Sequence, residues 1–101
     1  MRTAGIQRVF RDGQPVHGRR LVLFVAPGSG GLALIAGKKL GGAVQRNRAR
    51  RVLRAALHEV APQGLEGRDV VLVAREAMRD ARTQDLVAEM TELLEREEVR
   101  S

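Results

Sequence analysis

Hydrophobic residues recur along the chain at spacings that predict its helices. Residues 43–60 place apolar side chains at positions 49, 52, 53, 56, 57 and 60, which predicts a helix with one buried face. A second helix is predicted after Thr83, a good N-cap residue. Its apolar face comprises Leu86, Val87, Met90, Leu93 and Leu94. A short helix is also predicted at residues 5–10, ending before the turn signal Asp12-Gly13.

Continuous apolar runs at residues 21–26 and 69–74 predict buried strands. Residues 32–36 predict another strand, which residues 27–31 would join to the first as an antiparallel hairpin. This order of elements predicts an α+β fold, an α/β sandwich in which helices cover one face of a small, mainly antiparallel sheet.

The chain has 101 residues, which is enough for one domain with one modest core. Its longest apolar run is residues 21–26, far shorter than the roughly 20 residues that a membrane-spanning helix needs. It contains no cysteine, which excludes disulfides, thiolate metal sites and a cysteine nucleophile. We therefore expect a small basic domain in the cytoplasm, not in a membrane.

Charge is distributed unevenly along the chain. Residues 1–54 carry a net charge of +11 and residues 55–101 a net charge of −5, so the total of +6 hides a strongly basic half. Ordinary domains mix their charges, and segregation of this kind favours a surface that binds a polyanion.

The helix predicted at residues 43–60 carries most of its charge opposite the apolar stripe. Its polar residues there span an arc of roughly 200° at 100° per residue: Arg46, Asn47, Arg48, Arg50, Arg51 and Arg54. The five arginines repel one another and have almost no acidic partners one turn away. We therefore predict that this face binds a polyanion, in preference to the alternative of a solvated helix face.

The start of this helix suits an anion for a second reason. Gly41 and Gly42 precede the first turn, so free N–H groups and the positive end of the helix dipole lie beside Lys38 and Lys39. Backbone donors and lysines together would bind a phosphate, although both glycines also suit a simple turn.

The segment 38–54 resembles the signature of the bacterial ribonuclease P protein component. It reads Lys-Lys-Leu-Gly-Gly-Ala-Val-Gln-Arg-Asn-Arg-Ala-Arg-Arg-Val-Leu-Arg, and the centre of the signature is the Arg-Asn-Arg at 46–48. Further matches at residues 8–13, 21–25 and 69–75 follow in the family's order, so the likeness covers about residues 6–95.

The resemblance implies a single RNA-binding domain over residues 1–101, the protein subunit of an endoribonuclease that removes the 5′ leader of precursor tRNA. The implied partners are one catalytic RNA, expected at 1:1, and the precursor tRNA, with neither a membrane nor an obligate protein partner. Hydrolysis would take place on the RNA, which would hold most of the Mg²⁺, with no catalytic or metal-binding residue on the protein. The implied fold has about four strands in the order α-β-β-β-α-β-α, with a left-handed βαβ crossover.

Carried over residue by residue, the resemblance implies two groups of site residues. The RNA-binding group is Lys38, Lys39, Arg46, Asn47, Arg48, Arg50, Arg51 and Arg54. The candidates for a cleft that receives the leader are Ile6, Phe10 and Phe24. Ile6 stands where the family usually has an aromatic residue, so we expect leader stacking to be weaker there or to be replaced by apolar contact.

Two other classes of function were weighed. A DNA-binding regulator would place the arginine helix in a major groove, but Gln45 and Asn47 offer few groups for base readout. A nuclease acting alone would need clustered carboxylates or a histidine pair, whereas His17 and His58 lie 41 positions apart. We expect Asp69 to fix a loop or a cap instead of binding a metal.

Overall fold

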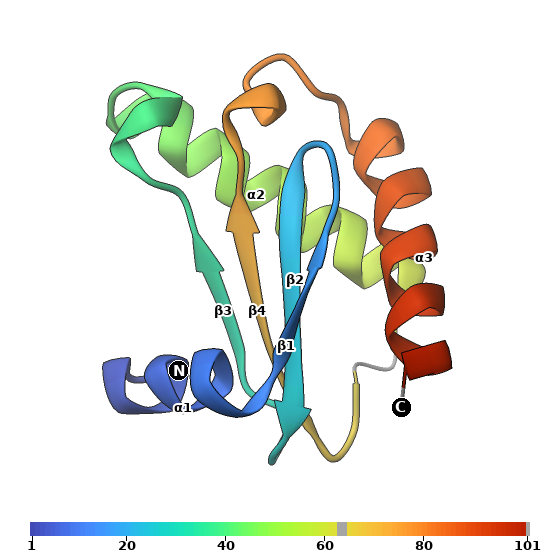
Figure 1. Ribbon diagram of the computed structural model, residues 1–101. Coiled ribbons are helices and arrows are strands. Elements are labelled where there is room, and N and C mark those ends of the chain that lie inside the picture. Colours follow the sequence, from blue (N-terminus) through green and yellow to red (C-terminus); the bar gives the residue numbers. More distant parts are fainter. Residues whose placement is uncertain (63–64, 101) are drawn as a thin grey trace.

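Three helices pack around a four-stranded sheet in the computed structural model, which describes residues 1–62 and 65–100 (Figure 1). The elements follow the predicted order: α1 Thr3–Asp12, β1 Gln14–His17, β2 Leu21–Pro27, β3 Leu32–Ile35, α2 Ala43–Val60, β4 Arg68–Ala74 and α3 Thr83–Arg100. Two short 3₁₀ turns, η1 at Lys38–Leu40 and η2 at Glu76–Met78, precede α2 and α3.

The strands are arranged β1-β2-β4-β3, with β2 antiparallel to both of its neighbours and β3 parallel to β4. The predicted hairpin between residues 21–26 and 32–36 is therefore wrong, because β4 lies between these two strands. The loop after β2 bonds to the start of β4 instead of folding back: Gly28 donates its N–H to the carbonyl of Gly67, and Val70 donates to the carbonyl of Gly31. Pairing with β1 and β4 already occupies both edges of β2.

Helix α2 connects the parallel strands β3 and β4. In Figure 1 both strands run upward, α2 passes behind the sheet, and β4 lies to the right of β3. This crossover is left-handed, as the resemblance implied, whereas almost all such connections are right-handed.

The main core lies between the sheet and the helices α2 and α3. The predicted helix faces are confirmed: the core contains Ala49, Leu53 and Ala56 from α2 and Leu86, Met90 and Leu93 from α3. These side chains pack against the strand residues Leu21, Leu23, Val25, Val70 and Leu72. The helical periodicity of the sequence therefore identified correctly which helix residues are buried.

Helix α1 packs on the opposite face of the sheet, so the prediction that the helices cover one face is wrong for this element. The fully buried Val9 forms a second apolar cluster with Ala26, Ala33 and Val71. These strand residues alternate with those of the main core, which makes both faces of the sheet apolar. That second apolar face gives α1 a place to pack.

The ends of two helices differ from their predicted positions. Helix α1 extends beyond residues 5–10 to span Thr3–Asp12, and it ends at Gly13, whose N–H donates to the carbonyl of Val9. Helix α3 begins at Thr83 itself, and the carboxylate of Asp85 accepts the N–H of Arg82 at 2.9 Å. Arg82, rather than Thr83, therefore precedes the first helical residue.

Candidate nucleic-acid interface

The connection from β3 to α2 exposes two lysines directly before the first turn of the helix. Leu40, 2% exposed, anchors the η1 turn in the core, while Lys38 and Lys39 are exposed. Gly41 has a φ of +114°, a backbone conformation that residues with a side chain rarely adopt, and it allows the sharp entry into α2. The sequence thus places both lysines beside the helix N-terminus, as predicted.

The predicted RNA-binding residues of α2 lie on the side of the helix away from the core. Asn47, Arg51 and Arg54 are exposed, whereas Arg46, Arg48 and Arg50 are partly buried. Nη1 of Arg50 donates to Oδ1 of Asn47 at 3.0 Å, so these two side chains support each other along the helix.

The cations of residues 38–54 have no acidic partner within the described part of the chain. All ion pairs there belong to four other arginines: Arg8, Arg11, Arg20 and Arg68. The glutamates of α3 that form ion pairs bind elsewhere, Glu89 to Arg20 and Glu97 to Arg68. The positive charge of α2 and η1 is therefore not neutralised by the acidic helix of the same chain.

Arg46 carries a further unsatisfied group. Its Nε atom is buried and has no hydrogen-bond partner among the described residues. A buried donor without an acceptor costs free energy, and most such groups in proteins are paired. The side chain of Arg46 thus has unused hydrogen-bonding capacity where the charge of α2 is concentrated.

Arg48 differs from its neighbours because it bonds to its own chain. Its Nη2 donates to the carbonyl of Ala81 at 2.8 Å, and its Nη1 donates to the carbonyl of Arg79 at 3.3 Å. These bonds hold the connection between β4 and α3 against α2. The sequence did not reveal this role, because backbone carbonyls carry no residue-type signal and these lie more than 30 positions away.

Replacing Arg48 with Met should destabilise the fold more than the same change at Arg51. Hydrogen bonds to a charged group contribute about 1.5–3 kcal/mol each, but partial exposure reduces this, so we expect a loss of about 1–3 kcal/mol in the free energy of unfolding. For a domain of this size the melting temperature should fall by roughly 5–15 °C. Thermal unfolding followed by circular dichroism measures both variants, and equal melting temperatures would contradict the role given to Arg48.

The three candidates for leader contact lie together on the sheet face that α1 covers. The rings of Phe10 and Phe24 meet edge to face, with centroids 4.8 Å apart and an angle of 70° between their planes. Ile6 packs partly buried in the same cluster, and Phe10 remains 40% exposed. This aromatic surface lies on the sheet face that α1 covers, whereas α2 packs on the opposite face of the sheet (Figure 1).

Two further apolar residues extend the aromatic surface, and sequence reasoning missed them. Ile35 and Val73 are partly buried in the same cluster. The period of two along the strands assigns them to this face, since Ile35 follows Ala33 and Val73 follows Val71 at a spacing of two. The alternation is not visible in the sequence because both faces of these strands are apolar, so the apolar runs are continuous.

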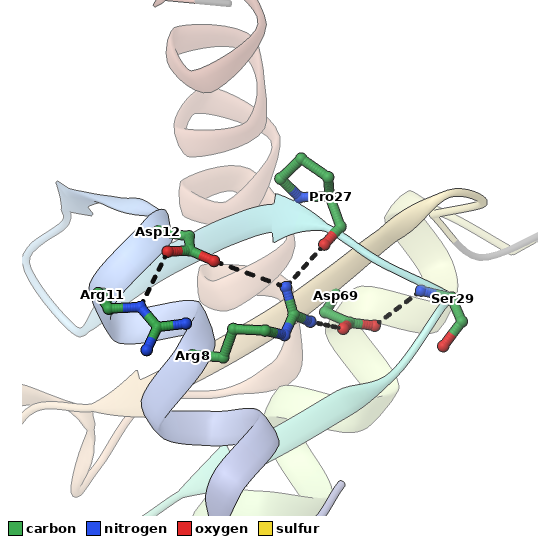
Figure 2. Close-up of polar contacts among 6 residues, drawn as sticks. All are labelled: Arg8, Arg11, Asp12, Pro27, Ser29 and Asp69. Carbon is green, nitrogen blue, oxygen red and sulfur yellow. Dashed lines mark hydrogen bonds and ion pairs between the residues drawn. The ribbon is translucent and has the colours of Figure 1, made fainter.

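Asp69 fixes the loop between β2 and β3, as the sequence predicted (Figure 2). Its buried carboxylate accepts the N–H of Gly31 at 2.7 Å and of Ser29 at 3.2 Å through Oδ1, and the guanidinium of Arg8 through Oδ2. The bond from Gly31, with those from Ser29 and Arg8, lowers the pKa of Asp69 below its ordinary value despite the opposing effect of burial. Asp69 is therefore a structural carboxylate.

No group of three or more histidine, aspartate or glutamate side chains converges as a potential metal site within residues 1–62 and 65–100. The two histidines, His17 and His58, are both exposed. None of the helices in this part of the chain is long and apolar enough to span a membrane.

Comparison with known proteins gives consistent results. The chain matches the family model described as Ribonuclease P over residues 1–98. It is 34% identical to the ribonuclease P protein component of Shouchella clausii, covering 90% of this chain and 78% of that protein. It is 37% identical to the component of Symbiobacterium thermophilum, covering 89% of this chain and 82% of the relative.

Solved structures show the same fold. The RNase P protein of Staphylococcus aureus superimposes with a TM-score of 0.80 at 25% identity, over 94% of this chain and 90% of that one. The RNase P protein of Thermotoga maritima also gives a TM-score of 0.80, at 19% identity and over 95% of this chain and 94% of that chain. On the family match, the sequence identity and the shared fold, this chain belongs to the ribonuclease P protein family.

Proposed function

We propose that this chain is the RNA-binding protein subunit of ribonuclease P and assists removal of the 5′ leader from precursor tRNA. Family membership supports a role in this endoribonuclease. One observation carries the assignment to RNA binding: seven cations within residues 38–54 lack an acidic partner among the described residues. A folded RNA supplies the phosphates that would neutralise them.

The catalytic RNA docks on the basic face formed by η1 and α2. Arginine binds phosphate through a planar fork of donors, and the helix N-terminus adds free N–H groups beside the lysines. The proposed contacts are the eight predicted residues: Lys38, Lys39, Arg46, Asn47, Arg48, Arg50, Arg51 and Arg54. Arg48 contributes mainly by holding the β4–α3 connection in place, because two of its nitrogens already donate to carbonyls.

The unpaired leader lies on the aromatic surface. Bases of single-stranded RNA stack on exposed rings and pack against apolar side chains with little sequence preference. Phe10 offers an exposed ring, Phe24 supports it, and Ile6 offers apolar contact without stacking. Because this site has two aromatic rings, its contacts with the leader contribute less to the binding free energy than the contacts of the basic face with the catalytic RNA do.

Hydrolysis belongs to the RNA subunit, and the protein contributes no catalytic residue. The complex requires Mg²⁺, which the RNA holds for the most part. The described residues do not fit a Mg²⁺ site, since the carboxylates of Asp69, Glu89 and Glu97 bind arginines and no three acidic or histidine side chains converge. The chain acts as one RNA-binding domain over residues 1–101, in the cytoplasm, in a 1:1 complex without an obligate protein partner.

A reconstitution assay tests the proposal. The chain, the catalytic RNA and precursor tRNA labelled at its 5′ end are combined at low Mg²⁺, where the RNA alone is slow. We expect efficient release of the leader only when protein and RNA are both present. Cleavage by the protein alone would instead support an independent nuclease, and preference for a duplex DNA operator would support a DNA-binding regulator.

A further inference from the structure

Arg8 lies on α1 two residues before Phe10. Its guanidinium bonds to the last residue of β2 and to a residue at the start of β4 (Figure 2). Its Nη1 donates to the carbonyl of Pro27 at 2.9 Å, and its Nη2 donates to the carboxylate of Asp69. Asp12, one turn further along α1, lies 3.9 Å from the same Nη1. The charge of Arg8 is therefore neutralised within the chain, unlike the charges of α2.

Asp69 is a rigid anchor for this contact. It is 7% exposed, and its other oxygen accepts the N–H groups of Ser29 and Gly31. A Cβ atom at Gly28 would overlap the carboxylate, and one at Gly31 would lie 3.0 Å from its Oδ1. The loop backbone thus closes around Asp69, so the point to which Arg8 binds is fixed by β4 and by the loop together.

Helix α1 depends on such anchors for its position. It has only 10 residues and no side-chain hydrogen bond at its N-cap, and helices of this length are marginal in water without tertiary contacts. Val9 buries one side of the helix against the sheet, and Arg8 adds directional bonds at the neighbouring position. A rotation of α1 that broke these bonds would also move Phe10 away from Phe24.

We infer that Arg8 is a positioning residue for the leader, acting through Asp69 and the carbonyl of Pro27 to hold α1 so that Phe10 and Phe24 keep their edge-to-face arrangement. The inference rests on the proposed function and adds a residue that does not itself contact RNA. Because Arg8 is already neutralised, its contribution is geometric, and it differs in this respect from the unpaired arginines of α2.

The test compares Arg8→Met with Arg11→Met in the reconstituted holoenzyme. Both changes remove one positive charge from α1, but the side chain of Arg11 is 74% exposed and, among the described residues, bonds only to its neighbour Asp12. Binding is measured to precursor tRNA carrying a leader, to the same tRNA without a leader, and to the catalytic RNA. Arg8→Met should weaken binding of the precursor roughly tenfold, the scale of one lost base stack, whereas Arg11→Met should change it less than about twofold.

Leader dependence separates positioning from general stability. Arg8→Met should leave the affinity for the leaderless tRNA and for the catalytic RNA unchanged, whereas a fold that is merely weakened would lower all three affinities together. A folded Arg8→Met variant with the leader dependence of the wild type would overturn the inference. If the wild-type holoenzyme itself shows no leader dependence, the proposed leader site fails instead, so the two failures are distinguishable.

Two further variants keep the test decisive if Arg8→Met does not fold. Arg8→Lys keeps the charge beside Asp69 but lacks the planar fork that reaches both acceptors, so it should give an intermediate leader dependence. Asp69→Asn removes the same ion pair. Adding Arg8→Lys to Asp69→Asn should lower the affinity for the precursor little further, because the two residues act as one unit. If the losses of precursor affinity caused by Arg8→Lys and by Asp69→Asn were fully additive in the double variant, the inference would be overturned.

Discussion

Changing Arg50, Arg51 and Arg54 together to Gln will weaken binding of the catalytic RNA by roughly 10²–10³-fold near 0.1 M salt. The same change will reduce the slope of log affinity against log salt concentration by about two to three, because each phosphate contact contributes roughly 0.7 to 0.9. The physical cause is the loss of counterion release, since these cations have no acidic partner among the described residues. Titrations at four or five salt concentrations measure both quantities.

A matched variant separates local contacts from net charge. Changing Arg2, Arg11 and Arg96 to Gln removes the same number of charges from the N-cap of α1, from α1 and from α3, all at exposed positions, although Arg96 also donates a hydrogen bond to the carbonyl of His17. This control should change the slope by less than about one, because distant charges are screened beyond roughly 10 Å. Equal slopes for the two variants would show that RNA responds to total charge, and the basic face of α2 would not be the docking site.

Sulfate or phosphate will raise the melting temperature of the free protein by roughly 10–20 °C at concentrations about 100 times their dissociation constant. An anion that binds only the native state stabilises it by about 2.7 kcal/mol at that excess. For a domain of this size, each kcal/mol shifts the melting temperature by about 4–8 °C. The cause is relief of repulsion among the unpaired cations of α2 and η1, together with N–H groups at the start of α2 that suit an anion.

General salting effects of these anions require their own control. Sulfate and phosphate stabilise most proteins weakly by exclusion from the surface, without saturating. The shift in the wild type should saturate and should exceed that in chloride at matched ionic strength, whereas the variant lacking Arg50, Arg51 and Arg54 should show a smaller saturating shift. A melting temperature that responds identically in both proteins would argue against a preformed anion site.

The elements predicted from the sequence were correct where the signal is local. Helix α2 occupies the predicted residues 43–60, and its apolar stripe is buried against the sheet. The arginines of this helix have no acidic residue within one turn of them in the sequence, which is also a local property, so their lack of a local acidic partner could be predicted. The role of Asp69 was predicted as well, because a lone acid at the start of a strand commonly caps a loop.

The predictions that were wrong concern contacts between distant parts of the chain. The pairing of β3 with β4 in place of β2, and the packing of α1 on the second face of the sheet, depend on which distant segments come together in the folded chain. Neither has a signature within a few residues. The bonds of Arg48 and Arg8 belong to the same class, since backbone carbonyls accept two bonds from Arg48 and one from Arg8.

By itself, the sequence determined which segments form the three helices and the strands β2, β3 and β4, although not the short strand β1. It also determined that the segment 38–54 carries charge without nearby compensation, because periodicity and charge spacing act over one or two turns. Only the tertiary structure decided which arginines have no partner among the described residues, as Arg51 has none, and which bond within the chain, as Arg8 and Arg48 do. The reason is that a guanidinium group selects its acceptor by distance in space, and folding sets those distances.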